Sequence, residues 1–116
     1  MKVNRIEEVK AYDAKQHFDM KGLRLQGFDA SPSKNFWVGL SHFLPGGGAE
    51  TSNSPLEKVY IVVEGEVVVI TDDGETTLKK MDSCWLAASE RRAIVNRTNL
   101  PASMLVIMPY PEGTVR

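Results

Sequence analysis

Lys58, Tyr60 and Val62 alternate along a valine-rich stretch, KVYIVV, so on a strand they would share one face. A lysine that is buried or lies beside another cation has a lowered pKa. Its neutral amine can accept a proton or form a Schiff base with a carbonyl. The Tyr60 phenol could donate a proton to a substrate or a hydrogen bond to a developing oxyanion. These residue types indicate proton-transfer or imine chemistry, provided that the strand faces a cavity.

Arg92 offers a planar fork of donors that suits a carboxylate or a phosphate. The hydroxyls of Ser52 and Ser54 could orient such a substrate. Simpler interpretations stay open for each of these residues. Lys58 could reach the surface and pair with a glutamate, and Arg92 could belong to a charged loop over 90–92. The two serines could be ordinary loop residues.

His42 is a further candidate base. In the stretch NFWVGLSHFL, either the even-numbered residues, His42 among them, or the odd-numbered ones could face inward, and apolar content does not decide between them. Cys84 is the single cysteine, so no internal disulfide can form, and we expect it to pack as a small apolar group. The sequence contains no phosphate-binding loop, dinucleotide fingerprint or serine nucleophile elbow.

The chain of 116 residues fits one domain, 1–116, and its 42% of hydrophobic residues suffice for a core. A net charge of −1 gives no electrostatic footprint for nucleic acid or an anionic membrane. The charged N-terminus lacks the apolar region of a signal peptide, and the longest apolar runs are too short to span a bilayer. We therefore expect a cytoplasmic protein without nucleic-acid or membrane partners.

Runs of β-branched and aromatic residues, separated by glycine and proline, predict an all-β sandwich or barrel. Region 5–18 is predicted as a short helix, or as irregular chain with one strand. The Pro45–Gly48 run should end the first barrel strand, and Asp72-Asp73-Gly74 indicates a hairpin. The predicted strands cover residues 35–44, 58–71 with a turn at Glu64-Gly65, 75–80, 83–88, 92–98 and 103–110.

Over residues 35–110 the chain resembles the cupins, which are jelly-roll barrels also called double-stranded β-helices. Gly46 and Gly65 fit the two glycines of the first cupin motif, and Asn96 fits the asparagine of the second. The spacing between the motifs is short, as in small bacterial cupins. Where metal-binding cupins carry their ligands, this chain has other residues: Ser52 and Ser54 at the first two histidine positions, Lys58 at the glutamate position and Arg92 at the third histidine position.

Serine is a poor neutral ligand and the two cations repel a metal, so we expect no metal and no other cofactor. A shift of one residue would place Thr51 and Asn53 on the histidine positions, but neither alignment supplies a histidine. The resemblance also implies that the motif positions face the barrel interior. Two buried cations would then need a counter-charge, either an internal carboxylate (Glu50, Glu57 or Glu64) or an anionic ligand.

These residues suggest a metal-independent cupin that acts on a small organic acid by isomerase, lyase or decarboxylase chemistry. Lys58, Tyr60 and His42 are the candidate catalytic residues, and the candidate substrate-binding residues are Arg92, Ser52, Ser54 and Asn96. The alternatives are a cupin that only binds a small anion or sugar acid, and a barrel that serves protein association. The resemblance also implies a homodimer, since small cupins usually pair through barrel faces or exchanged edge strands.

Overall fold

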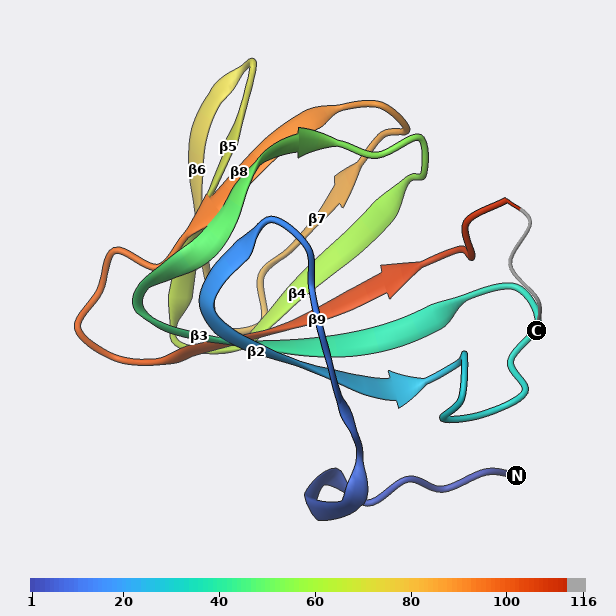
Figure 1. The fold of residues 1–116 in the computed structure, drawn as a ribbon. Helices are drawn as coiled ribbons and strands as arrows, with labels where there is room; N and C mark the ends of the chain where they lie inside the picture. The colour runs from blue at the N-terminus through green and yellow to red at the C-terminus, as the bar shows by residue number, and fades with distance from the viewer. Residues whose placement is uncertain (113–116) are drawn as a thin grey trace.

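The computed structural model describes residues 1–112, and its regular secondary structure is almost entirely β-strand, as the sequence predicted (Figure 1). After a short 3-10 helix, η1 (Ile6–Glu8), nine strands follow. They are β1 (Ala11–Tyr12), β2 (His17–Gln26), β3 (Trp37–Asn53), β4 (Lys58–Glu64), β5 (Glu66–Thr71), β6 (Gly74–Lys79), β7 (Ser83–Leu86), β8 (Arg91–Val95) and β9 (Ala102–Met108). No helix in this part of the chain is long and apolar enough to span a membrane.

The strands form one antiparallel sheet that curls into a nearly closed barrel, in the order β6-β5-β8-β3-β9-β4-β7. β2 pairs with the edge of β3 opposite to β9 and β8, and β1 pairs with β2. The long strand β3 joins the two halves of the barrel. Its first part, from Trp37 to Phe43, pairs with β9 and β2, and its last part, from Gly48 to Asn53, pairs with β8. In Figure 1, β3 runs beside β2 and β9 and then turns to lie beside β8.

The Pro45–Gly48 run does not end a strand, which corrects the boundary predicted from the sequence. β3 bends there and continues for several residues. A side chain on Gly48 would collide with the backbone carbonyl of Ile94, and one on Gly47 with that of Asp19. The glycines therefore let β3 press closely against β8 and the start of β2 while it changes partners.

The second difference is β2, which was not predicted. Its sequence, HFDMKGLRLQ, mixes charged and apolar residues and shows no clear run of β-branched residues. Pairing with β3 from His17 to Gln26 nevertheless makes it a full member of the wall. This strand brings residues to the interior that the sequence patterns did not place there.

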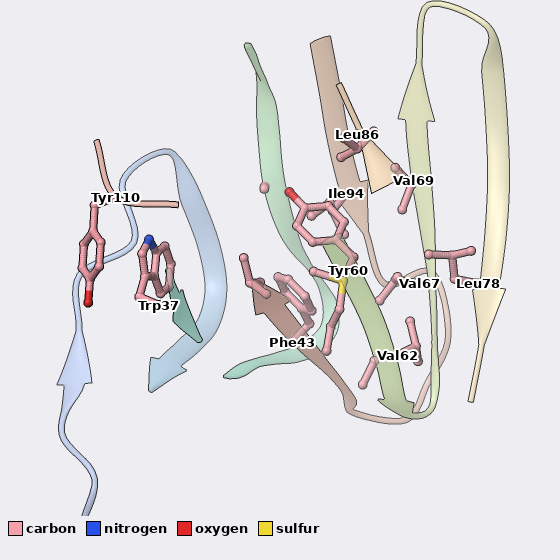
Figure 2. Packing of buried hydrophobic residues seen from close by; sticks show 14 residues of the cluster. Trp37, Phe43, Tyr60, Val62, Val67, Val69, Leu78, Leu86, Ile94 and Tyr110 are labelled. Carbon is pink, nitrogen blue, oxygen red and sulfur yellow. The ribbon is translucent and has the colours of Figure 1, made fainter. Parts of the chain in front are cut away.

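The buried apolar side chains form one cluster that extends along the barrel interior (Figure 2). Val62, Val67, Val69 and Leu78 pack together where β4, β5 and β6 meet, and Trp37 and Tyr110 lie apart from them. Trp37 and Phe28 pack as tilted rings with centroids 5.7 Å apart. The core thus extends from the aliphatic residues of β4, β5 and β6 to the aromatic pair Trp37 and Tyr110.

Candidate active site

Two strands that are not neighbours in the sheet, β4 and β8, present cationic side chains to the barrel interior. On β4, Lys58, Tyr60 and Val62 share the buried face, as their alternation predicted, and Lys58 and Tyr60 are only 5% and 2% exposed. On β8, Arg92 is 7% exposed. The surface-loop interpretation of Arg92 is therefore wrong. Its neighbour Arg91 points outward and pairs with Asp72 at 2.8 Å.

Arg92 is held in place by three hydrogen bonds. Its Nε donates to the phenol oxygen of Tyr60 at 2.7 Å. Its Nη1 donates to Ser52 Oγ at 3.0 Å and to the carbonyl oxygen of Glu50 at 3.1 Å. Ser52 lies directly opposite Arg92 in the β3–β8 ladder, which sets this contact. The guanidinium is thus fixed before any ligand arrives, and a fixed donor loses little entropy on binding.

The interior shifts the proton affinity of both β4 side chains. Burial, reinforced by the charge of Arg92, lowers the pKa of Lys58 to about 8. Burial raises the pKa of Tyr60 even though Arg92 opposes that shift by its charge and its hydrogen bond. At neutral to mildly alkaline pH the site therefore combines a lysine that gives up its proton readily with a phenol that keeps its own.

The carboxylates considered as internal counter-charges all lie on the exposed side of the barrel wall. Glu50 offers Arg92 only its backbone carbonyl. The Glu57 carboxylate accepts a hydrogen bond from Trp85 Nε1 at 2.8 Å, and Glu64 pairs with Lys80 at 3.7 Å. Within residues 1–112 no acidic side chain forms an ion pair with Lys58 or Arg92.

These side chains line a hollow of about 570 Å³, here called the barrel cavity. This volume falls in the range of small-molecule sites. One part of the wall is apolar, with Phe28, Trp37, Ile94, Met104 and Val106. The polar part includes His17, Ser41, Ser52, Ser54, Lys58, Tyr60 and Arg92. Ser54 also has a local role, because its Oγ accepts a hydrogen bond from the Leu56 backbone N–H at 3.1 Å.

Two candidate residues have other positions than a substrate site requires. His42 lies on the face of β3 that does not line the cavity, where its Nδ1 contacts Ser103 Oγ at 2.7 Å, whereas Trp37 and Ser41 of the same strand line the cavity. Asn96 is fully buried, yet it does not line the barrel cavity.

The Asn96 amide ties the β8–β9 loop to β3. Its Nδ2 donates to the carbonyl oxygens of Phe43, Leu44 and Leu100, and its Oδ1 accepts from the backbone and hydroxyl of Thr98. Both ends of the amide are used in this way, so Asn96 has a structural role. It does not reach the cavity, and the predicted substrate contact does not fit its position.

The histidine at the cavity is His17, at the start of β2, which the sequence patterns did not single out. Its Nδ1 lies 2.7 Å from the carbonyl oxygen of Lys15, an acceptor, so Nδ1 carries the proton and Nε2 has a free lone pair. Burial lowers the pKa of His17, and the charges of Arg92 and Lys58 lower it further. Recognising β2 as a barrel strand would have placed His17 at the site.

The cavity does not suit a divalent cation. The positions that hold a metal in metal-binding cupins carry two hydroxyls and two cations, and the cations are buried together. Among the described residues, no group of three or more histidine, cysteine, aspartate and glutamate side chains could hold a metal ion.

The sequence of this chain matches both a protein-family model and a curated protein. A family model described as "Cupin domain" matches residues 39–108. A protein of Mycobacterium tuberculosis named "Beta-D-galactosidase Rv1717" is 43% identical over 115 residues, which cover 99% of each chain.

Two solved structures show the same fold at low sequence identity. The polyketide cyclase RemF from Streptomyces resistomycificus superposes with a TM-score of 0.86 at 18% identity, over 100% of this chain and 84% of that one. A sugar phosphate isomerase of the cupin superfamily from Silicibacter pomeroyi gives a TM-score of 0.80 at 24% identity, over 96% of this chain and 76% of the other.

Proposed function

Because this chain belongs to the cupin family, we propose that its barrel cavity binds a small organic anion without a metal ion and transforms it by proton transfer. One observation carries the proposal: Lys58 of β4 and Arg92 of β8 are both buried and line the same cavity, and no carboxylate within residues 1–112 pairs with them. An uncompensated pair of buried cations costs stability, so an anionic ligand is the natural counter-charge.

Arg92 is the anchor in this proposal. Two of its nitrogen atoms are held by Tyr60, Ser52 and the Glu50 carbonyl, and this leaves Nη2 for the ligand. Lys58 lies close enough to Arg92 for the charge of Arg92 to lower the pKa of Lys58. An acidic group between them would receive charge-assisted hydrogen bonds from both, which are about twice as strong as neutral ones.

Proton transfer follows from the two pKa shifts. The neutral amine of Lys58 removes a proton from the carbon next to the carbonyl or carboxyl group of the substrate and becomes an ammonium group. The electron pair moves onto the carbonyl oxygen, which accepts a hydrogen bond from the Tyr60 phenol. Return of the proton to a neighbouring atom gives an isomer, and departure of a group from the next carbon gives a lyase product. The same amine could instead form a Schiff base with a keto or aldehyde group.

Calorimetric titration of the metal-free protein with small mono- and dicarboxylates tests the binding step. We expect Lys58→Met and Arg92→Gln to weaken binding by ~10-fold or more, since each removes charge-assisted hydrogen bonds. Lys80→Met and Arg91→Gln, which remove the same charges from the exposed face, serve as matched controls and should leave affinity unchanged. Equal affinity in all four variants would exclude this site.

Turnover separates an enzyme from a binding protein with the same cavity. A bound acid whose α-hydrogen exchanges with deuterium in heavy water, at a rate that Lys58→Met abolishes, indicates proton abstraction. Reduction with borohydride that attaches a keto acid to Lys58 indicates the Schiff-base route. Tight binding without exchange or trapping would assign the protein to carriage or sensing of the anion.

Glycoside hydrolysis is a second candidate, favoured by the 43% identity to the protein named as a galactosidase. Most glycosidases use a pair of carboxylates on either side of the scissile bond. Asp13 is the only carboxylate among the described residues of the cavity wall, and it is exposed. Hydrolysis of nitrophenyl β-D-galactoside that is lost in Asp13→Asn, with Lys58→Met unaffected, would favour this candidate over the first.

A further inference from the structure

The barrel cavity concentrates positive charge in a protein whose net charge is −1. Among residues 1–112, its wall includes four cationic side chains, Lys15, Arg24, Lys58 and Arg92, against a single carboxylate, Asp13. Lys58 and Arg92 form the anion site proposed above. A third cation of the wall, Arg24, is half-buried and lies on a different strand, β2, opposite Gly39 of β3.

Three aromatic rings hold the Arg24 guanidinium. Its Cζ atom lies 3.9 Å from the ring centroid of Phe28, 4.2 Å from that of Tyr12 and 5.0 Å from that of Trp37. Such contacts use the flat faces of a guanidinium and leave its N–H groups directed outward in the plane. The rings thus fix the orientation of Arg24 as hydrogen bonds fix that of Arg92.

Arg24 has no counter-charge in the part of the chain that the structure describes. No carboxylate in residues 1–112 forms an ion pair with it, including Asp29, which lines two adjoining smaller hollows together with Arg24. Its Nε is buried and has no hydrogen-bond partner. This arrangement parallels that of Arg92, a rigid cation at the cavity wall without an acidic partner.

The two cationic places are separate. Arg92 is bonded to Tyr60, whose ring lies near Ile94 and Phe43, whereas Arg24 is stacked on Trp37, which lies apart from that group (Figure 2). A cavity of about 570 Å³ has room for a ligand that reaches both. A ligand with one acidic group would leave one of the two guanidiniums unpaired.

We propose that the barrel cavity recognises a small organic molecule with two acidic groups, one held by Lys58 and Arg92 and the other by the ring-stacked Arg24. The inference rests on the proposed anion site and adds its ligand class. The second acidic group is a carboxylate or a phosphate, since a guanidinium pairs with either in the same bidentate way. The aromatic rings and the apolar wall then cover the carbon skeleton between the two groups.

Matched ligand pairs test this inference by calorimetric titration of the full chain. Butyrate is compared with succinate and glutarate, and glycerate is compared with phosphoglycerate. In the comparison that contains the acidic group recognised by Arg24, we expect the ligand with two acidic groups to bind ~10-fold or more tightly than its one-acid partner. Preference within the first pair identifies a second carboxylate, and preference within the second pair a phosphate.

The decisive variant is Arg24→Gln. It should reduce the affinity for the two-acid ligand to that of its one-acid partner, while the affinity for the one-acid ligand changes by less than ~2-fold. Arg91→Gln, which removes an exposed arginine from β8, is the matched control and should change neither affinity. If Arg24→Gln does not fold, Arg24→Lys keeps a charge without the planar fork and should reduce the preference in part.

The outcomes separate the two claims. Binding of one-acid ligands that depends on Lys58 and Arg92, without any gain from a second acidic group, overturns the Arg24 inference and leaves the anion site intact. Equal weakening of both ligand types by Arg24→Gln also overturns it and makes Arg24 a structural residue. Absence of binding by every acid tested overturns the anion site and, with it, this inference.

Discussion

Arg92 Nε donates a 2.7 Å hydrogen bond to the phenol oxygen of Tyr60, and both side chains are buried. This bond joins β8 to β4 across the barrel interior and leaves the phenol proton directed elsewhere. The bond fixes the position of the guanidinium, whose positive charge helps to lower the pKa of Lys58. The Arg92–Tyr60 pair thus links two strands of the barrel and also fixes the charge that lowers the pKa of Lys58.

Tyr60→Phe removes this acceptor while keeping the ring. Because Arg92 Nε would then be buried without a partner, we expect the free energy of unfolding to fall by about 1–3 kcal/mol, as measured by urea denaturation. Any turnover should fall more than ligand affinity, since the phenol also loses its proton-donating role. Unchanged stability would show that the Arg92–Tyr60 bond contributes little, and turnover at the wild-type rate would remove Tyr60 from the mechanism.

Lys58 makes stability depend on pH in alkaline solution. Its pKa is about 8 in the folded protein and 10.5 in an unfolded reference chain, so between these values the unfolded state binds more protons. Stability should therefore rise with pH from about 8 to about 10.5 through this group. Burial raises the pKa of Cys84 and Tyr60, which adds the opposite trend at high pH.

The contribution of Lys58 is isolated by comparison of wild type with Lys58→Met in buffers without small carboxylates or phosphate. The stability of wild type should increase relative to the variant across the window from about 8 to 10.5. A saturating anion should shrink this difference, because a negative charge beside Lys58 raises its pKa again. If the stabilities of wild type and variant change in parallel with pH in the absence of ligand, the pKa of Lys58 is not shifted by folding.

Asn96→Ala tests whether this residue is structural. The substitution leaves the carbonyls of Phe43, Leu44 and Leu100 without their shared donor, so we expect a loss of ~2–4 kcal/mol in the free energy of unfolding. At a temperature where the variant is folded, its ligand affinity should match wild type. A loss of affinity without a loss of stability would instead restore Asn96 to the binding site.

Self-association can be predicted from the outer face of the sheet. Val59 of β4 lies between Trp85 of β7 and Ile107 of β9, and Trp85 is 60% exposed. Since the cupin resemblance implied a homodimer, we expect this apolar row to be the contact between two copies. Trp85→Glu should convert a dimer to a monomer in light scattering, and Leu100→Glu, at another exposed apolar residue, should not. A monomeric wild-type protein would contradict the prediction.

The fold and the inner face of β4 could be predicted because they follow from strong local patterns. Alternation with period two placed Lys58 and Tyr60 on one face, and the cupin resemblance placed Arg92 opposite them. The direction of His42 could not be predicted, since both faces of the first part of β3 carry apolar residues. The neighbours Trp37 and Phe43, which are buried, decide it in the structure.

Other parts of the site depend on long-range contacts. His17 and Arg24 reach the cavity only because β2 pairs with β3, and a strand with charged residues on both faces gives no periodic signal. Asn96 occupies the expected buried place, but its amide is satisfied by a loop whose path no sequence pattern shows. Packing therefore determines which of the buried polar residues meet a ligand.

The most direct test of the anion site is a crystal structure of protein purified without added metal and grown with a dicarboxylate, with elemental analysis of the same batch. We predict density for the acid between Lys58 Nζ and Arg92, and no stoichiometric metal. A metal bound in the cavity at stoichiometric level, or a carboxylate of the protein paired with Lys58 in place of the acid, would contradict the account.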